Sequence, residues 1–237
     1  MPGGGDFLPG RDGEVDDPVD ERYWWKGLTS VKESLEGNGF EAHVAEDLPG
    51  AREIVLGEIL PRIRPRLVSW GDSLTVIASG LLDDIRALPG VEFLDPFEDG
   101  LSSGERFERR RRALLADLFV TGTNALTRDG RLVNLDMVGN RVGGITFGPK
   151  RVLILAGRNK IVSDLEGAME HIRNCTAPAN AIRHHAGKHP EMNPPCVKTG
   201  TCSGCTSPMR ICNTWTITEK SFPPGRITVV LINRDRG

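Results

Sequence analysis

The sequence predicts an α/β fold in which a mostly parallel sheet carries helices on both of its faces. Short apolar runs recur along the chain and end in small polar residues, as buried strands do where they open into loops. Helical or turn segments separate one run from the next, which is typical of a parallel sheet. With 237 residues, of which 38% are hydrophobic, the chain is long enough to fill the core of one such domain.

The helices are predicted from apolar residues that recur at helical spacing. A first helix over residues 23–35 ends before Gly37, and a second over residues 51–59 ends before Pro61. A third, over residues 164–172, is the last long helix before a cluster of cysteines.

The strands are predicted from the short apolar runs between these helices. The strands of the main sheet are expected at residues 67–70, 91–94, 118–120, 132–135 and 152–156. Two further strands, 215–218 and 227–232, are separated by a Pro-Pro-Gly turn and are expected to pair as a C-terminal hairpin.

Composition divides the chain into two parts. Residues 1–20 are rich in Gly, Pro and Asp and predict a flexible tail, whereas residues 21–237 predict a single α/β domain with a Cys-rich insertion at about 194–213. The N-terminus lacks the apolar stretch of a signal peptide, and no later segment approaches a membrane span. We therefore expect a cytoplasmic protein. A net charge of −2 does not suggest a nucleic-acid partner.

Four cysteines with the spacing C-x5-C-x2-C-x6-C lie in this polar insertion: Cys196, Cys202, Cys205 and Cys212. In a reduced compartment they are free to bind metal, and four thiolates hold either a tetrahedral zinc ion or an iron–sulfur cluster. Only Cys202 and Cys205 are separated by two residues, and the gaps to Cys196 and Cys212 are wider. This spacing favours an iron–sulfur cluster, of the 4Fe-4S type, over Zn. Thiols that bind no metal are a further alternative.

Three other features, the histidines before the cysteines, the fifth cysteine and a run of arginines, are interpreted as structural or solvated residues. His184, His185 and His189 precede the cysteines, and any of them is able to replace a cysteine as a ligand, but a solvated basic turn is favoured. Cys175 is interpreted as a core thiol at a helix end. The arginine run at residues 109–112 is interpreted as a solvated helix face, because glutamates lie within one helical turn of it.

Small and polar residues follow several predicted strands, where ligands of open α/β sheets bind. The loops after residues 67–70 and 118–120 offer hydroxyl and backbone N–H groups that suit a phosphate or carboxylate, and residues after 132–135 supply a third wall. Turn formation alone explains any one loop, but several on one rim predict a site for a small anionic ligand. The candidate ligand-binding residues are Gly71, Asp72, Ser73, Thr75, Thr121, Gly122, Thr123, Asn124, Asn134, Asp136, Gly139, Asn140, Arg141 and Lys160.

Six stretches carry a family resemblance: residues 67–73, 117–125, 134–136, 139–142, 147–150 and 156–161. They resemble the lactate-utilisation (LUD) domain family, close to its protein C branch, over residues from about 23 to the C-terminus. The cysteine segment resembles the subgroup that carries such a cluster. Two positions depart from the family pattern, since Asp72 and Met137 stand where glycine is usual.

The resemblance implies a fold similar to the superfamily of ribose-phosphate isomerases and CoA transferases. It also implies an accessory role in the oxidation of L-lactate to pyruvate beside iron–sulfur redox proteins, with no established catalytic residue. The alternative is an enzyme that acts on a sugar phosphate or CoA thioester, in which zinc only braces the hairpin. In that enzyme Asp136 or Asp72 is the acid/base candidate, and Arg141 or Lys160 the anion clamp.

Overall fold

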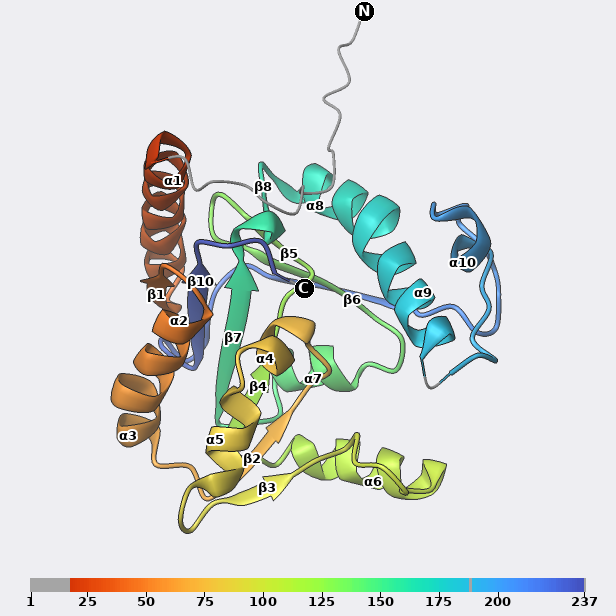
Figure 1. Cartoon of the computed structure of the whole chain (residues 1–237), viewed down its shortest axis with the longest axis horizontal. Helices are drawn as coiled ribbons and strands as arrows, with labels where there is room; N and C mark the ends of the chain where they lie inside the picture. The colour runs from red at the N-terminus through yellow and green to blue at the C-terminus, as the bar shows by residue number, and fades with distance from the viewer. Residues whose placement is uncertain (1–17, 188, 237) are drawn as a thin grey trace, which may run out of the picture.

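The structure is a computed structural model that describes residues 18–187 and 189–236. Its main sheet has six strands in the order β1-β10-β7-β4-β2-β3, and every neighbouring pair is parallel (Figure 1). The predicted α/β class with a mostly parallel sheet is therefore confirmed. The six strands are β1 (Glu41–Ala45), β2 (Leu67–Trp70), β3 (Glu92–Leu94), β4 (Leu118–Thr121), β7 (Arg151–Gly157) and β10 (Ile227–Ile232).

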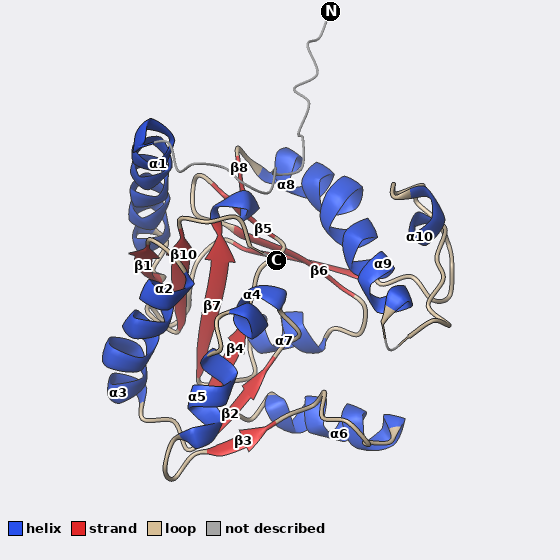
Figure 2. Cartoon of the chain, viewed as in Figure 1, coloured by secondary structure: helices blue, strands red, loops and turns tan. Residues whose placement is uncertain are grey.

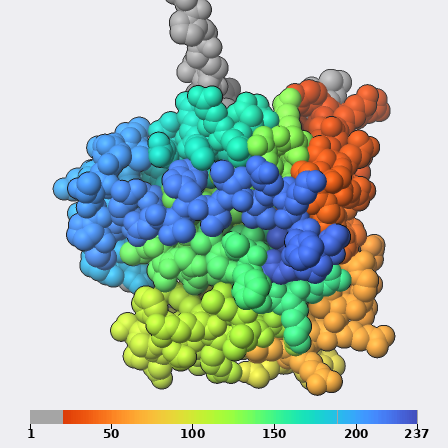
Figure 3. Space-filling view, turned by 180° about the vertical axis from the view of Figure 1, so that it is seen from behind, coloured from red at the N-terminus to blue at the C-terminus, as the bar shows by residue number. Residues whose placement is uncertain are grey.

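A second sheet of four strands has the order β8-β5-β6-β9. Its pairs β5/β6 and β6/β9 are antiparallel, whereas β5/β8 is parallel. In Figure 3 the late part of the chain, drawn in blue, crosses the rear surface of the molecule. The four strands are β5 (Ala125–Thr127), β6 (Leu132–Asp136), β8 (Ile161–Val162) and β9 (Thr214–Thr218).

Helices connect and cover these strands (Figure 2). They are α1 (Pro18–Gly37), α2 (Leu48–Ile54), η1 (Val55–Ile59), α3 (Leu60–Ile63), α4 (Leu74–Ala78), α5 (Leu81–Ala87), α6 (Ser103–Ala113), α7 (Asn140–Thr146), η2 (Arg158–Lys160), α8 (Leu165–His171), η3 (Ile172–Thr176), α9 (Ala177–Ala186) and α10 (Cys196–Thr199). Two of the linking turns, η1 and η3, are π-helical, and each continues the α-helix before it into the α-helix after it.

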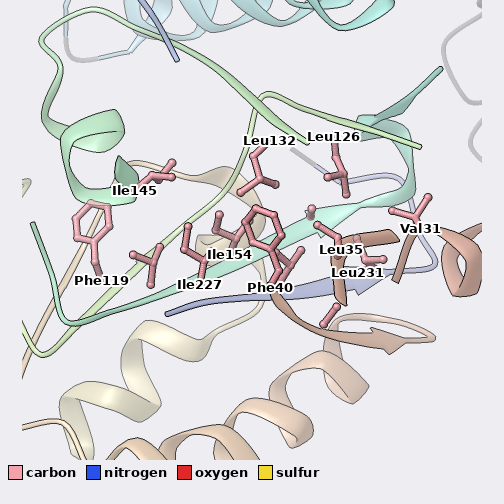
Figure 4. Close-up of a cluster of buried hydrophobic side chains, with 14 of the residues drawn as sticks. Val31, Leu35, Phe40, Phe119, Leu126, Leu132, Ile145, Ile154, Ile227 and Leu231 are labelled. Atoms are coloured by element: carbon pink, nitrogen blue, oxygen red, sulfur yellow. The ribbon is translucent and has the colours of Figure 1, made fainter. Parts of the chain in front are cut away.

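Three hydrophobic clusters order these elements in layers. One joins the six-stranded sheet to α2, η1, α3, α4 and α5. A second joins the opposite face of that sheet to α1, α7 and the small sheet, as Figure 4 shows for Leu35, Phe119, Leu132 and Ile154. The third lies between the small sheet and the α8–η3 segment. Helices thus cover both faces of the main sheet, as predicted.

The predicted C-terminal hairpin is wrong, because β9 and β10 belong to different sheets. All six residues of β10 are buried, so the strand fits between β1 and β7 in the middle of the parallel sheet. β9 pairs instead with β6. The strand predicted at 132–135 is likewise β6 of the small sheet, and not a strand of the main one.

The structure describes the predicted Cys-rich insertion but only the last residues of the predicted N-terminal tail. Residues 1–17 of the predicted tail lie outside the described residues, and α1 begins at Pro18. The predicted Cys-rich insertion at about 194–213 contains α10 and leads into β9. No helix in the described ranges is both long and apolar enough to cross a membrane.

Candidate anion site and cysteine cavity

The loops that follow β2 and β4 touch one another at the carboxyl end of the main sheet. A Cβ atom added to Gly71 would lie 2.9 Å from Thr121 Oγ1 and 3.1 Å from Arg141 Cγ. A Cβ atom added to Gly122 would lie 2.7 Å from Ser73 Oγ. A side chain at either position would force the neighbouring side chains to shift, so glycine suits both positions and lets the loops approach closely.

Arg141 of α7 ties these loops to the small sheet. Its Nη1 donates to Asn134 Oδ1 at 2.6 Å, and its Nη2 donates to Asn124 Oδ1 at 2.8 Å and to the Leu135 carbonyl at 3.0 Å. Asp136 Oδ2 accepts the backbone N–H of Arg141 at 3.1 Å. Burial lowers the pKa of the Arg141 guanidinium. Because the fold uses these donors, Arg141 acts as a positioning residue.

Asp72 connects the loop after β2 to α9. Its carboxylate accepts two hydrogen bonds from Arg183, at 2.5 Å and 3.3 Å, and its Oδ2 lies 3.6 Å from His184 Nε2. Burial lowers the pKa of His184, and the charge of Arg183 lowers it further. Asp72 therefore holds α9 at this rim.

Two arginines of α6, Arg106 and Arg110, add to the charged residues at this rim. Together they form what we call the arginine cluster: Asp72, Arg106, Arg110, Asp136, Arg141 and Arg183. The sequence did not predict the role of Arg106 and Arg110. Burial lowers the pKa of Arg110 and the charge of Arg106 lowers it further, whereas the charges of Asp136 and Asp72 oppose the shift. The Arg110 guanidinium lies 5.5 Å from the ring centroid of Phe107. The i, i+4 spacing of the two arginines was the available signal, because it places both on one helix face.

The interpretation of residues 109–112 as a solvated face is thus correct for part of the run only. The Arg111 side chain is 70% exposed and pairs with Glu108 at 3.1 Å. Arg110 is half-buried and faces the cluster. Glutamates nearby in sequence did not decide the orientation, because the packing of α6 on the sheet did.

Other predicted ligand-binding residues serve the local fold. The Thr123 hydroxyl lies 3.0 Å from the Ala125 carbonyl and donates to it. Thr75 is buried in α4. Gly139 has a φ of +91° and precedes Asn140, the first residue of α7, so glycine suits this turn. The positions of these residues are consistent with a structural role, and their binding role stays a prediction.

Lys160 lies apart from the arginine cluster. It is buried in η2, beyond the end of β7, and burial lowers the pKa of its ammonium group. The opposing charges come from Asp235 and Cys175, not from Asp72 or Asp136. The pKa of His171 is lowered by burial and by the charge of Lys160. The predicted anion clamp of Lys160 therefore belongs to a different part of the carboxyl edge.

The four cysteines of the predicted metal site line one cavity of about 20 Å³: Cys196, Cys202, Cys205 and Cys212. Burial raises the pKa of Cys196, and the charges of the other three raise it further. Arg210 braces the cavity wall, since its guanidinium donates to the carbonyls of Cys205 and Cys212, each at 2.7 Å. Four sulfur donors around one cavity fit a thiophilic metal.

The four cysteines line one cavity without forming a closed ligand set in the described part of the chain. Among the described residues, no group of three or more His, Cys, Asp or Glu side chains is arranged to hold a metal ion. Cys175 is exposed and is not one of the residues that line the cavity, so its interpretation as a core thiol is wrong. His184 lies beside Asp72, and His189 lies 3.1 Å from Glu191.

The sequence model of the LUD domain family matches residues 28–232. The chain belongs to the LUD domain family. The LUD domain therefore runs from α1 to the end of β10 and includes both sheets, the arginine cluster and the cysteine cavity.

Other comparisons of this LUD domain protein are more distant. None of the curated proteins matches the chain. It is similar to a DUF162 family protein from Deinococcus radiodurans, with 17% identity over 88% of this chain and 97% of that one and a TM-score of 0.46. It is also similar to eIF2B delta from Chaetomium thermophilum, with 13% identity over 66% of this chain and 60% of that one and a TM-score of 0.26.

Proposed function

We propose that this LUD domain protein is a cytoplasmic accessory protein of lactate utilisation, from the protein C-like branch of the family. It supports oxidation of L-lactate to pyruvate beside iron–sulfur redox proteins. The observation that carries the proposal is the gathering of four cysteines around one cavity within a LUD domain. Those cysteines hold an iron–sulfur cluster, which supplies one-electron transfer when bound.

The chain's own residues prepare the cavity for metal. Cys196 is the first residue of α10, and Cys202, Cys205 and Cys212 belong to the loop that leads from this helix to β9. The pKa of Cys196 is raised, so a metal cation is what favours its thiolate form. Arg210 holds two of the cysteine carbonyls and thereby keeps the loop folded around the cavity.

The rim of the main sheet provides the second site, for a small anionic ligand. Arg183 of α9 binds Asp72 at this rim, and Ala177 at the start of the same helix lines the cysteine cavity. One helix thus contacts both sites. We infer that the accessory protein binds a small anion of the pathway close to its metal centre.

Metal analysis of the full chain purified without oxygen tests this proposal. We expect about four iron and four sulfide per chain, as a cluster of the 4Fe-4S type held by four cysteines requires. Cys205→Ser should lose most of the iron, whereas the matched control Cys175→Ser should retain it, because Cys175 lies outside the cavity. Iron-free, colourless protein that takes up no iron on reconstitution would exclude the electron-transfer role.

The volume of the cavity favours a second candidate. A space of about 20 Å³ accommodates roughly one water-sized species, which suits a single ion better than a four-iron cluster. In this alternative a structural zinc ion braces the cysteine loop of an enzyme that acts on a sugar phosphate or CoA thioester. Stoichiometric zinc, together with a raised melting temperature in the presence of those compounds but not lactate, would support it.

A further inference from the structure

Arg106 and Arg110 have donors that the fold leaves unused. The Nε atoms of both side chains are buried and have no hydrogen-bond partner in the described part of the chain. An unsatisfied buried donor destabilises the fold, and the cost is larger on a charged group. The two side chains lie one helical turn apart on α6, so this face of the helix carries two guanidinium groups whose buried Nε donors no acceptor of the described residues offsets.

The surroundings of Arg110 favour an anion. The charges of Asp72 and Asp136 act on both Arg110 and Arg141, and the charge of Arg106 acts on Arg110. Arg183 is hydrogen-bonded to Asp72. Four guanidinium groups are thus offset by two carboxylates. The carboxylates are already occupied, because Asp72 binds Arg183 and Asp136 accepts backbone N–H groups at the start of α7. Two positive charges of this cluster are therefore left for a ligand to balance.

The cluster is open to solvent and its geometry is fixed. Arg106 and Arg110 are half-buried, and the Asp72 and Arg183 side chains are 25% and 31% exposed, so the cluster is reached from solvent. The Arg110 guanidinium lies 5.5 Å from the ring centroids of both Phe97 and Phe107, which restricts the orientation of its planar group. Ser102 caps α6 with a complete capping box and so fixes the helix that carries both arginines.

We propose that Arg106 and Arg110 bind a doubly charged oxyanion, the phosphate group of a phosphorylated metabolite, at the rim of the main sheet. The inference rests on the proposed function, because it assigns a ligand class to the anion site described there. A phosphate presents oxygens in several directions to two guanidinium groups and carries the charge that the cluster lacks. A singly charged carboxylate such as lactate supplies half of that charge.

Calorimetric titration of the full chain at constant ionic strength and pH 8 tests the ligand class. The probes are inorganic phosphate and L-lactate. We expect phosphate to bind at least tenfold more tightly than lactate. Arg106→Gln and Arg110→Gln should each weaken phosphate binding by about tenfold or more, as loss of a charge-assisted hydrogen bond does. Arg111→Gln is the matched control on the same helix and should bind phosphate like the parent chain, since Arg111 is exposed.

Equal affinity for phosphate and lactate would overturn the inference, as would unchanged phosphate binding in Arg110→Gln. Arg110→Lys separates loss of binding from loss of folding, because it keeps the charge and loses the fork; we expect intermediate affinity and an unchanged melting temperature. Iron content measured on the same samples keeps the two proposals distinct. Iron-free protein that binds phosphate through Arg110 would refute the iron–sulfur proposal alone. Iron-loaded protein that does not bind phosphate would refute the proposed ligand class alone.

Discussion

At the scale of single residues, Asp117 joins three segments of the main sheet. Its Oδ2 accepts the backbone N–H groups of Arg66 and Leu67, at 2.9 Å and 3.0 Å, and its Oδ1 accepts a hydrogen bond from Lys150 Nζ at 2.6 Å. The hydrogen bond from Lys150 and the one from Leu67 lower the pKa of Asp117 to about 2. Since this pKa lies below that of the unfolded chain, the stabilisation is present above about pH 4 and is lost as the pH falls through about 2.

We therefore expect Asp117→Ala to lower the free energy of unfolding by about 1–2 kcal/mol at pH 7, with a loss that shrinks toward zero near pH 2. Urea unfolding at several pH values measures this difference. Lys150→Ala is the control, and its cost should stay below about 1 kcal/mol because the Lys150 side chain is 79% exposed. A cost for Asp117→Ala that does not change with pH would contradict the account.

Arg226 illustrates a buried cation that stabilises a helix end. Its guanidinium donates to four backbone carbonyls at and beyond the end of α7, and burial lowers its pKa. Arg226→Met should leave these carbonyls unsatisfied and cost about 3 kcal/mol or more, measured by urea unfolding. Arg226→Lys keeps a donor and should cost less. An Arg226→Met protein as stable as the parent would show that water replaces the bonds.

At the scale of elements, the turn between β5 and β6 fits against α1 through a glycine. Gly130 has a φ of +82°, and a Cβ atom there would lie 2.8 Å from the backbone of Ser34 and Leu35. We expect Gly130→Ala to cost about 2–4 kcal/mol, from the left-handed backbone and the overlap together. Gly100→Ala is the matched control, since φ is +85° but no described atom lies within 4 Å; it should cost about 1 kcal/mol. Equal melting temperatures of the two variants would contradict the packing argument.

Apolar periodicity predicted the elements that bury most of their length. The strands at 67–70 and 227–232 agree with β2 and β10 to the residue, because each is a buried run with clear ends. β1 was not predicted, since this edge strand reads Glu-Ala-His-Val-Ala and lacks an apolar run. Partner choice was not predicted either, because the pairing of β9 with β6 depends on contacts between residues about eighty positions apart.

At the scale of the whole molecule, the candidate site was predictable where it depends on sheet topology. The ends of parallel strands meet at one edge, so the contact between the loops of Gly71 and Gly122 followed from the predicted sheet. Arg110 and Arg183 were not foreseen, because they reach the rim from α6 and α9, and the placement of a helix is decided by tertiary packing. The sequence indicated the residue types of the cysteine site, whereas the shared cavity required the structure.

The layers of the molecule also predict how metal removal should act. The cysteine segment contacts the third hydrophobic cluster through Cys212 and joins the small sheet through the Asn213 N–H, which donates to the Asp136 carbonyl at 2.9 Å. The central strands β7 and β10 belong to the two other clusters. Local opening follows the elements with the fewest buried contacts.

Removing metal from the loaded protein should therefore speed amide hydrogen exchange in α10 and the loop before β9, while β7 and β10 stay protected. Cys205→Ser should reproduce this pattern without a chelator, and Cys175→Ser should not. Faster exchange in β7 or β10 would show instead that the cysteine centre stabilises the whole fold.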